Sequence, residues 1–180
     1  MPSTLHRRIE SLSLGQALTF LRTAEETGGE LLEMEAVMRP GAGTPPHVHL
    51  LQEERFEILD GSASFRVGRR RLTCSAGDTL AVKPRVAHRF RNESDADVRL
   101  RVELRPALDT EALFRSLYAL DRDGRVNRLG APNPLRTAVL AQGFGDSFFW
   151  LAGVPVGVQR AAFAPLAPLG RALGYGDCYP

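Results

Sequence analysis

The feature that most constrains the fold is an alternation of apolar and polar residues between Gly29 and Arg105. Apolar side chains at every second position are typical of strands that bury one face and expose the other. The clearest runs cover residues 32–38, 63–67 and 98–104. Turn signals rich in Gly, Pro, Asn and Asp separate the runs, at residues 39–41, 60–61, 67–68, 76–78 and 92–95. Many short strands with regular turns predict an antiparallel barrel or sandwich, and residues 17–22 are expected to add one more strand.

After Pro106 the apolar residues follow a helical period. Thr110 is the predicted N-cap of a first helix that ends near residues 123–124, with an apolar stripe made by Leu113, Leu117 and Leu120. Asn133 and Pro134 predict the N-cap and first position of a second helix that runs through Gln142.

The segment 147–175 is strongly apolar, but Gln159 and Arg160 interrupt it and three prolines break it. A membrane span needs about 20 mostly apolar residues without such breaks. We therefore expect two or three short helices here that cover the barrel or form a dimer contact, and no membrane attachment.

A chain of 180 residues with 43% hydrophobic residues suits one compact domain. We divide it into an N-terminal arm and strand (1–28), a β-barrel (29–105) and a helical C-terminal extension (106–180) that packs on the barrel or at a homodimer interface. The first ten residues are not followed by an apolar stretch or a cleavage site, so no signal peptide is expected and the predicted location is cytoplasmic. Cys74 and Cys178 lack metal-site or disulfide-framework spacing and are expected to be free thiols.

Lys83 is the only lysine among 23 basic residues, and we interpret the excess of arginine as the codon bias of a G+C-rich, bacterial genome. The densest cluster, at residues 69–71, follows an expected hairpin turn. Acidic residues alternate with arginine through most of the chain, whereas nucleic-acid binding requires a basic stripe with interleaved aromatic residues. The pattern favours a solvated, salt-bridged surface and no nucleic-acid partner.

Three histidines and one glutamate are predicted to face the barrel interior. His47 and His49 are two positions apart, so on a strand their imidazoles share one face. Glu54 shares its face with the apolar residues 56 and 58, whereas Glu53 shares its face with charged neighbours. Because Glu54 has an odd offset from His49, the chain must turn or bulge within residues 50–53. His88 shares its face with apolar residue 90 and also points inward.

An ionised carboxylate and three imidazoles in an apolar interior are costly to bury without a partner, and a metal cation removes that cost. A single buried histidine is more often a hydrogen-bonded core residue, but the combination of four inward groups indicates a site for one divalent ion. The mixed nitrogen and oxygen donors suit Fe, Mn, Ni, Cu, Co or Zn. Four protein ligands leave one or two positions open on an octahedral ion, as a reacting site requires.

Residues 29–105 resemble the cupin superfamily. The first cupin motif, G(x)5HxH(x)4E(x)6G, is met at every position, by Gly41, His47, His49, Glu54 and Gly61. The second, G(x)5PxG(x)2H(x)3N, is met at its ends by Gly77, His88 and Asn92. The middle of the second motif differs from the family pattern, because Lys83 stands in place of the proline and Arg85 in place of the glycine. Arg85 is therefore expected to need a backbone conformation that glycine adopts more easily.

The resemblance implies an all-β fold, a cupin-type double-stranded β-helix or jelly-roll barrel, here with additional short C-terminal α-helices. It also implies that His47, His49, Glu54 and His88 are the metal ligands, in agreement with the parity argument. It implies little about the reaction, because cupins include dioxygenases, isomerases, epimerases, decarboxylases, storage proteins and transcription factors.

Two function classes remain. The first is a metal-dependent, dioxygenase-like oxidoreductase acting on a small apolar or aromatic molecule, with Glu54 as ligand and base and a substrate pocket lined by Met34, Met38, Phe56 and Phe90. These apolar residues can equally be barrel core. The second class is a non-catalytic, metal-dependent module that binds or senses a small molecule and uses the C-terminal helices as a homodimer or partner surface. The absence of a helix-turn-helix signature disfavours a transcription factor.

Overall fold

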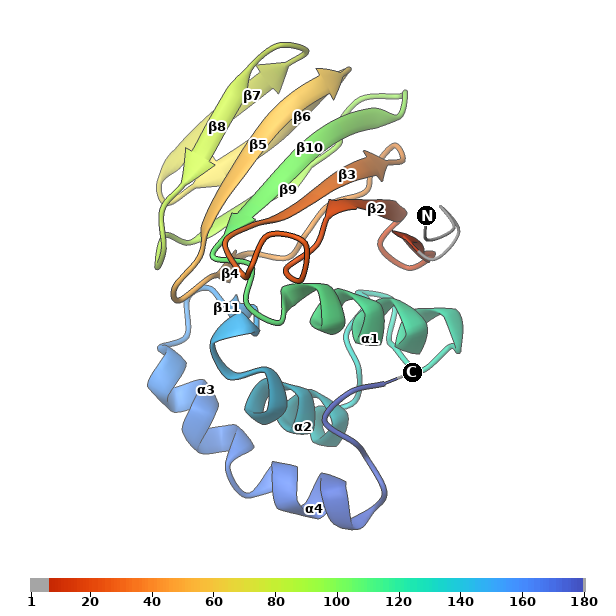
Figure 1. Ribbon diagram of the computed structural model, residues 1–180, viewed down its shortest axis with the longest axis vertical. Helices are drawn as coiled ribbons and strands as arrows, with labels where there is room; N and C mark the ends of the chain where they lie inside the picture. The colour runs from red at the N-terminus through yellow and green to blue at the C-terminus, as the bar shows by residue number, and fades with distance from the viewer. Residues whose placement is uncertain (1–6, 180) are drawn as a thin grey trace.

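The computed structural model describes residues 7–179 and places two antiparallel sheets at one end and four α-helices at the other (Figure 1). The strands are β1 (Arg8–Ser11), β2 (Gln16–Arg22), β3 (Leu32–Met38), β4 (His47–Val48), β5 (Glu53–Asp60), β6 (Ser62–Val67), β7 (Arg70–Ser75), β8 (Thr79–Val82), β9 (His88–Arg91), β10 (Val98–Arg105) and β11 (Trp150–Leu151). The helices are α1 (Thr110–Arg122), α2 (Pro134–Phe144), α3 (Val156–Phe163) and α4 (Leu166–Ala172).

The strands form a six-stranded sheet, β1-β2-β3-β10-β5-β8, and a five-stranded sheet, β11-β4-β9-β6-β7. Neighbours that are distant in sequence, such as β3 with β10 and β4 with β9, give the crossed connections of a jelly roll. The predicted all-β jelly roll with C-terminal helices is confirmed, although the two sheets are not joined into a closed ring.

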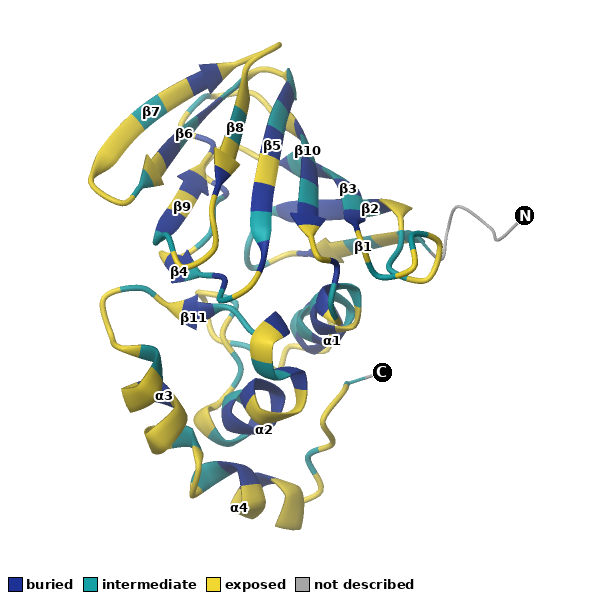
Figure 2. Cartoon of the chain, turned by 60° about the vertical axis from the view of Figure 1, so that its left-hand side comes forward, coloured by how far each residue is buried: buried dark blue, intermediate teal, exposed yellow. Residues whose placement is uncertain are grey.

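The barrel core follows from the alternation in the sequence. Every second residue of β3 is buried, from Leu32 to Met38, and β10 is buried in the same way (Figure 2). Val102 of β10 pairs with Met34 on one side and with Phe56 on the other, so three strands present apolar side chains to the interior in register. Both cysteines are free, as expected, with Cys74 buried and Cys178 exposed.

The outer face of the six-stranded sheet carries paired charges. Arg99 contacts Glu35 at 3.1 Å, and Arg101 contacts Glu57 at 2.9 Å and Glu33 at 3.4 Å. Cross-strand pairs of opposite charge stabilise a sheet modestly. The predicted salt-bridged surface is present on this face.

Helix α1 begins one residue earlier than the sequence predicted. Asp109 is the N-cap, and Thr110 is the first helical residue. The prediction for Thr110 was wrong because its hydroxyl faces the barrel, where it accepts a hydrogen bond from the side chain of Gln52 at 2.8 Å. Leu113 and Leu120 are buried as expected.

The remaining helices agree with the sequence. Asn133 caps α2 by accepting a hydrogen bond from the Arg136 backbone N–H at 3.0 Å, with Pro134 at the first helical position. Two short helices, α3 and α4, follow in the proline-broken segment. Among the residues that the structure describes, no helix combines the length and apolar content needed to cross a bilayer.

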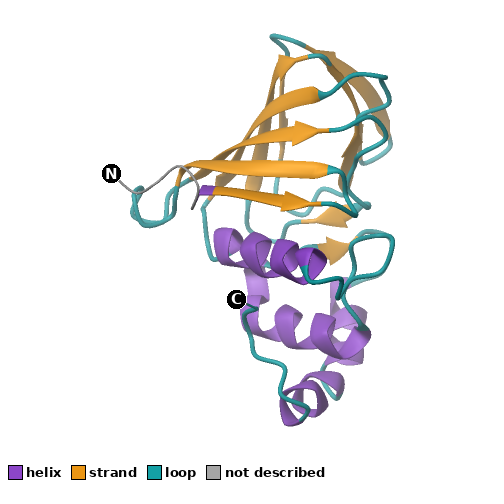
Figure 3. Cartoon of the chain, turned by 90° about the vertical axis from the view of Figure 1, so that its right-hand side faces the viewer, coloured by secondary structure: helices purple, strands orange, loops and turns teal. Residues whose placement is uncertain are grey.

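One short strand comes from the C-terminal extension. Trp150 and Leu151 of β11 pair with Val48 and His47 of β4, and the Trp150 side chain is buried. The helices therefore lie against the end of the barrel that carries β4, as Figure 3 shows from the side. This arrangement places residues beyond the barrel directly at the histidine-bearing strand.

Candidate metal site

The four predicted ligands come from both sheets. His47 lies on β4 and His88 on β9, where the two residues are direct cross-strand partners. Glu54 lies on β5 of the other sheet. The chain leaves β4 at Val48 and re-enters a strand only at Glu53, so the turn predicted within residues 50–53 is confirmed. This turn carries the chain between the sheets and lets Glu54 face the histidines despite its odd offset.

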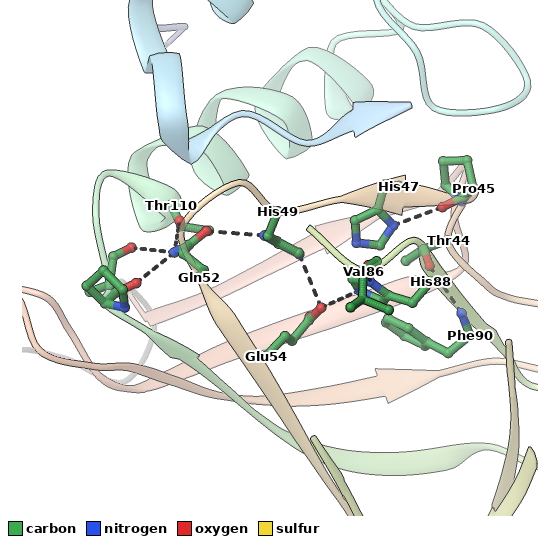
Figure 4. A network of polar contacts seen from close by, with 12 residues as sticks. Thr44, Pro45, His47, His49, Gln52, Glu54, Val86, His88, Phe90 and Thr110 are labelled. Carbon is green, nitrogen blue, oxygen red and sulfur yellow. Dashed lines mark hydrogen bonds and ion pairs between the residues drawn. The ribbon is translucent and has the colours of Figure 1, made fainter. Parts of the chain in front are cut away.

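The side chains converge on one point (Figure 4). One potential ligand atom from each of His47, His49, Glu54 and His88 lies within 4.8 Å of all the others, and all four residues are buried. Glu54 Oε2 lies 2.7 Å from His88 Nε2 and 3.2 Å from His49 Nε2. The structure therefore brings together the four residues that the sequence predicted as metal ligands.

The surrounding hydrogen bonds determine which ring nitrogen of each histidine carries the proton. His47 Nδ1 lies 2.9 Å from the Pro45 carbonyl oxygen, and His88 Nδ1 lies 3.0 Å from the carbonyl oxygen of Val86. Carbonyl oxygens only accept hydrogen bonds, so both Nδ1 atoms are protonated. In neutral imidazoles this leaves the Nε2 atoms with free lone pairs.

His49 is oriented in the same way by a side chain. Its Nδ1 lies 3.2 Å from Gln52 Oε1, and the Gln52 amide nitrogen donates toward the Pro106 and Ala107 carbonyl oxygens at 2.8 and 3.0 Å. Those carbonyl acceptors fix the amide orientation, so Oε1 must face His49 and accept its proton. Gln52 is 1% exposed and was not identified from the sequence. The residues next to Gln52 in the sequence do not indicate this role, because its partners Pro106 and Ala107 are distant in the chain.

The donor set fits a metal ion. His49 Nε2 is buried and has no hydrogen-bond partner within the described part of the chain, although it lies beside the Glu54 carboxylate. Lone pairs on neutral imidazoles and a carboxylate repel one another when they face the same small volume. A divalent cation turns that repulsion into coordination, and the proton on each Nδ1 is then held by an oxygen outside the ligand shell.

Burial and the contacts among the four side chains shift the pKa values of His47, Glu54 and His88. Burial is the largest effect on His47 and lowers its pKa to about 3, with the neighbouring His88 and His49 acting in the same direction. Burial alone would raise the pKa of Glu54, but the contacts with His49 and His88 outweigh it and hold that pKa below its ordinary value. Burial opposes charging of His88, yet the hydrogen bond that its protonated ring makes to Glu54 raises its pKa. The carboxylate thus stays ionised, as a ligand requires.

Comparison with known proteins agrees with the geometry. The family model for the cupin domain matches residues 34–104, the stretch that contains all four converging residues. Residues 34–104 of this chain form a cupin domain. No curated protein sequence matches the chain.

Solved structures share its fold. A predicted oxalate decarboxylase from Thermotoga maritima is 18% identical, with a TM-score of 0.53, and the match covers 58% of this chain and 96% of that one. An RmlC-like cupin from Shewanella frigidimarina is 20% identical, with a TM-score of 0.50 and coverage of 59% and 90%. KdgF from a Halomonas species is 13% identical, with a TM-score of 0.50 and coverage of 58% and 90%. At such identities the likeness shows the fold alone.

The departure in the second cupin motif has the structural effect that the sequence predicts. Arg85, in place of the usual glycine, adopts a φ of 65° in the left-handed region. Its backbone N–H donates to the His49 carbonyl oxygen at 2.7 Å, so this strained turn is tied to a residue of the four-residue cluster. Asn92, at the end of the motif, is fully buried and donates to the Met38 and Ala96 carbonyl oxygens at 3.0 and 2.7 Å.

An aromatic ring from the C-terminal extension lies over the site. The Phe149 ring centroid is 5.8 Å from that of His47 and 5.1 Å from that of His49, and it also packs against Phe114 of α1 at 5.2 Å. The pairing of β11 with β4 holds this residue in place, because Phe149 directly precedes Trp150. Sequence reasoning placed the extension on the barrel or at a dimer contact but did not connect it with the ligands.

The four apolar residues proposed to contact substrate all belong to the buried barrel core. Phe56 lies beside the site, with its ring centroid 6.4 Å from that of His88 and 5.0 Å from that of Phe90. Met34 and Met38 of β3 are almost completely buried. Their contact with a substrate stays a prediction.

Proposed function

We propose that this cupin binds one divalent metal ion through the Nε2 atoms of His47, His49 and His88 and a carboxylate oxygen of Glu54. The observation that carries this proposal is the convergence of four buried side chains, in which each imidazole has its Nδ1 against an oxygen outside the cluster and Nε2 as its free ring nitrogen. Four donor atoms within 4.8 Å of one another match a mononuclear first shell.

We further propose that the protein acts as a metal-dependent oxygenase of a small apolar or aromatic molecule, with dioxygen as the oxidant. A bound redox-active ion supplies Lewis acidity and electron transfer to such a site. The chain supplies a water-poor environment, since Phe149 and Phe56 lie against the histidine rings. Glu54, held ionised by His49 and His88, is the group placed to accept a proton from a substrate.

The apolar surroundings are what favour an apolar substrate. The rings of Phe149 and Phe56 lie next to the predicted ligands, and Phe56 packs against Phe90, its partner in the predicted pocket. A polar substrate would lose its hydration there without receiving matching hydrogen bonds.

A second candidate is a non-catalytic metal-dependent binding or sensing module. The burial of the site favours this alternative, because the exposed fractions of His47, His49, Glu54 and His88 are 7%, 4%, 5% and 2%. A ligand larger than dioxygen must displace Phe149, or the segment that carries it, to reach the donors. Slow exchange and tight retention suit a sensor better than rapid turnover.

Metal binding is tested first, by elemental analysis of protein purified without added metal and then reconstituted with Fe, Mn or Zn. We expect about one ion per chain in the wild type, and a substantial loss in His49→Ala and Glu54→Gln. Glu53→Gln is the matched control, since Glu53 is the adjacent carboxylate and pairs with Arg55 at 2.7 Å instead. Unchanged stoichiometry in His49→Ala, or an equal loss in Glu53→Gln, contradicts the assignment.

Catalysis is tested separately, by dioxygen consumption of iron-loaded and manganese-loaded protein with a panel of phenols and diketones. Uptake that depends on both metal and substrate, and that disappears in Glu54→Gln, supports the oxygenase. Retention of a panel member without any dioxygen uptake supports the binding module and refutes the oxygenase.

A further inference from the structure

A groove with a volume of about 560 Å³ lies on the five-stranded sheet, outside the metal site. Strands β6, β7 and β9 form its floor, and residues 41, 43–46 and 128–129 contribute to its walls. Five exposed arginines line it: Arg66, Arg71, Arg89, Arg91 and Arg128. Glu93 is the one acidic residue among its described lining, and its carboxylate accepts a hydrogen bond from Ser64.

Strand register places three of these arginines in one row. Arg66 of β6 is the direct cross-strand partner of Arg89 on β9 and of Arg71 on β7. Directly opposed side chains on neighbouring strands lie about 5 Å apart at Cβ, and like charges there destabilise the sheet. The row is therefore unfavourable unless an anion lies across it.

The other sheet of the same protein shows how such charges are balanced. On its outer face Arg99, Arg101 and Arg105 each contact a glutamate. Within residues 7–179, no salt bridge involves any of the five groove arginines, in contrast to these three.

The groove is separate from the metal site although it uses the same strands. Side chains alternate across a sheet, so on β9 His88 and Phe90 face inward while Arg89 and Arg91 face outward. Gly43 forms part of the wall, where an added Cβ would lie 2.8 Å from the Phe90 carbonyl oxygen and 3.1 Å from Arg91 Cβ. A glycine here lets the loop lie directly against the arginine strand and narrows the groove.

We propose that this groove binds a small phosphorylated molecule that carries at least two negative charges. Guanidinium groups present planar forks of N–H donors that match phosphate oxygens, and a row of three can contact neighbouring phosphoryl groups. The volume lies in the range of small-molecule sites, roughly 300–1,000 Å³. Nucleic acid is disfavoured because the aromatic residues of the lining, Phe65 and Phe90, are buried in the barrel and offer no stacking surface.

The test uses the full chain and inorganic pyrophosphate as the probe, with calorimetric titration at about 0.15 M ionic strength. We expect one site per chain and a loss of affinity of about tenfold or more in Arg66→Gln and in Arg89→Gln, since each removes a charge-assisted donor pair. Arg70→Gln is the matched control: it removes the same charge from the same hairpin, but Arg70 does not line the groove.

Three results would overturn the proposal: absence of pyrophosphate binding, equal weakening in Arg70→Gln, or tighter binding of a DNA duplex than of pyrophosphate. A stability readout distinguishes a ligand site from a structural role. Without anion, Arg66→Gln should unfold at a higher urea concentration than the wild type because like-charge repulsion is relieved, whereas a structural arginine would give the reverse. His49→Ala should leave pyrophosphate binding unchanged, so the result is independent of the metal site.

Discussion

Replacing Gln52 by leucine tests whether its buried amide both orients a ligand and joins the barrel to α1. The amide accepts a hydrogen bond from His49 Nδ1 and faces three oxygens, of Pro106, Ala107 and Thr110, at 2.8 to 3.0 Å. Its two N–H groups satisfy two of those oxygens at a time. Three hydrogen bonds are therefore lost in Gln52→Leu, while their partners stay buried.

A buried hydrogen bond contributes about 1 kcal/mol, so the metal-free variant should lose about 3 kcal/mol in the free energy of unfolding. For a chain of this size, that corresponds to a fall in Tm of roughly 6–12 °C. Metal affinity should fall by about 10- to 100-fold, because His49 is free to rotate or to change its tautomer.

The assay combines urea unfolding of the metal-free protein with a competition titration for zinc. Gln142→Leu is the control, because it makes the same chemical change at an exposed position where the amide oxygen accepts one bond from Arg171. We expect that control to change stability by less than about 0.5 kcal/mol. A loss below about 1 kcal/mol in Gln52→Leu, or an unchanged zinc affinity, would refute the reasoning.

Three further predictions concern single residues. Arg85→Gly should raise the free energy of unfolding by about 0.5–1 kcal/mol, since φ of 65° suits glycine; a loss in urea unfolding would contradict this. Phe149→Ala should cost about 2–3 kcal/mol and speed removal of bound zinc by a chelator; unchanged removal would mean that the ring does not cover the site. Metal-free protein should lose stability as the pH falls from about 6.5 toward 3. In this range the unfolded chain binds a proton at His47, whereas the folded protein, in which the pKa of His47 is about 3, does not. The loss, measured as the urea midpoint at each pH, should be smaller in His47→Gln.

The barrel could be predicted because its strands bury one face each. The strict alternation along residues 32–38 and 98–104 leaves one way to place apolar side chains inside. The inward direction of Glu54 and His88 follows in the same way from the buried residues 56, 58 and 90 of their own strands. The same reasoning required a turn before Glu54, and the structure has it. Local pattern was sufficient wherever a residue's role depends on its own strand.

Other features depend on partners that are distant in sequence. Strand β11 has only two residues and forms by pairing with the edge of β4. Two residues are too few to show an alternating pattern, so the sequence could not predict this strand. Gln52 acquires its role from the carbonyl groups of residues 106 and 107. The row formed by Arg66, Arg71 and Arg89 becomes visible only when the register of three strands is known.

The pairing of β11 with β4 means that the surroundings of the four converging residues extend beyond the stretch that matches the cupin domain. A fragment ending at Arg105 would retain all four histidine and glutamate donors, yet the outer edge of β4 beside His47 would lose its backbone partner. Such an edge invites pairing with another chain. Exchange of residues 106–180 for the extension of a related barrel would therefore change the surroundings of His47 and His49 without changing any of the four converging residues.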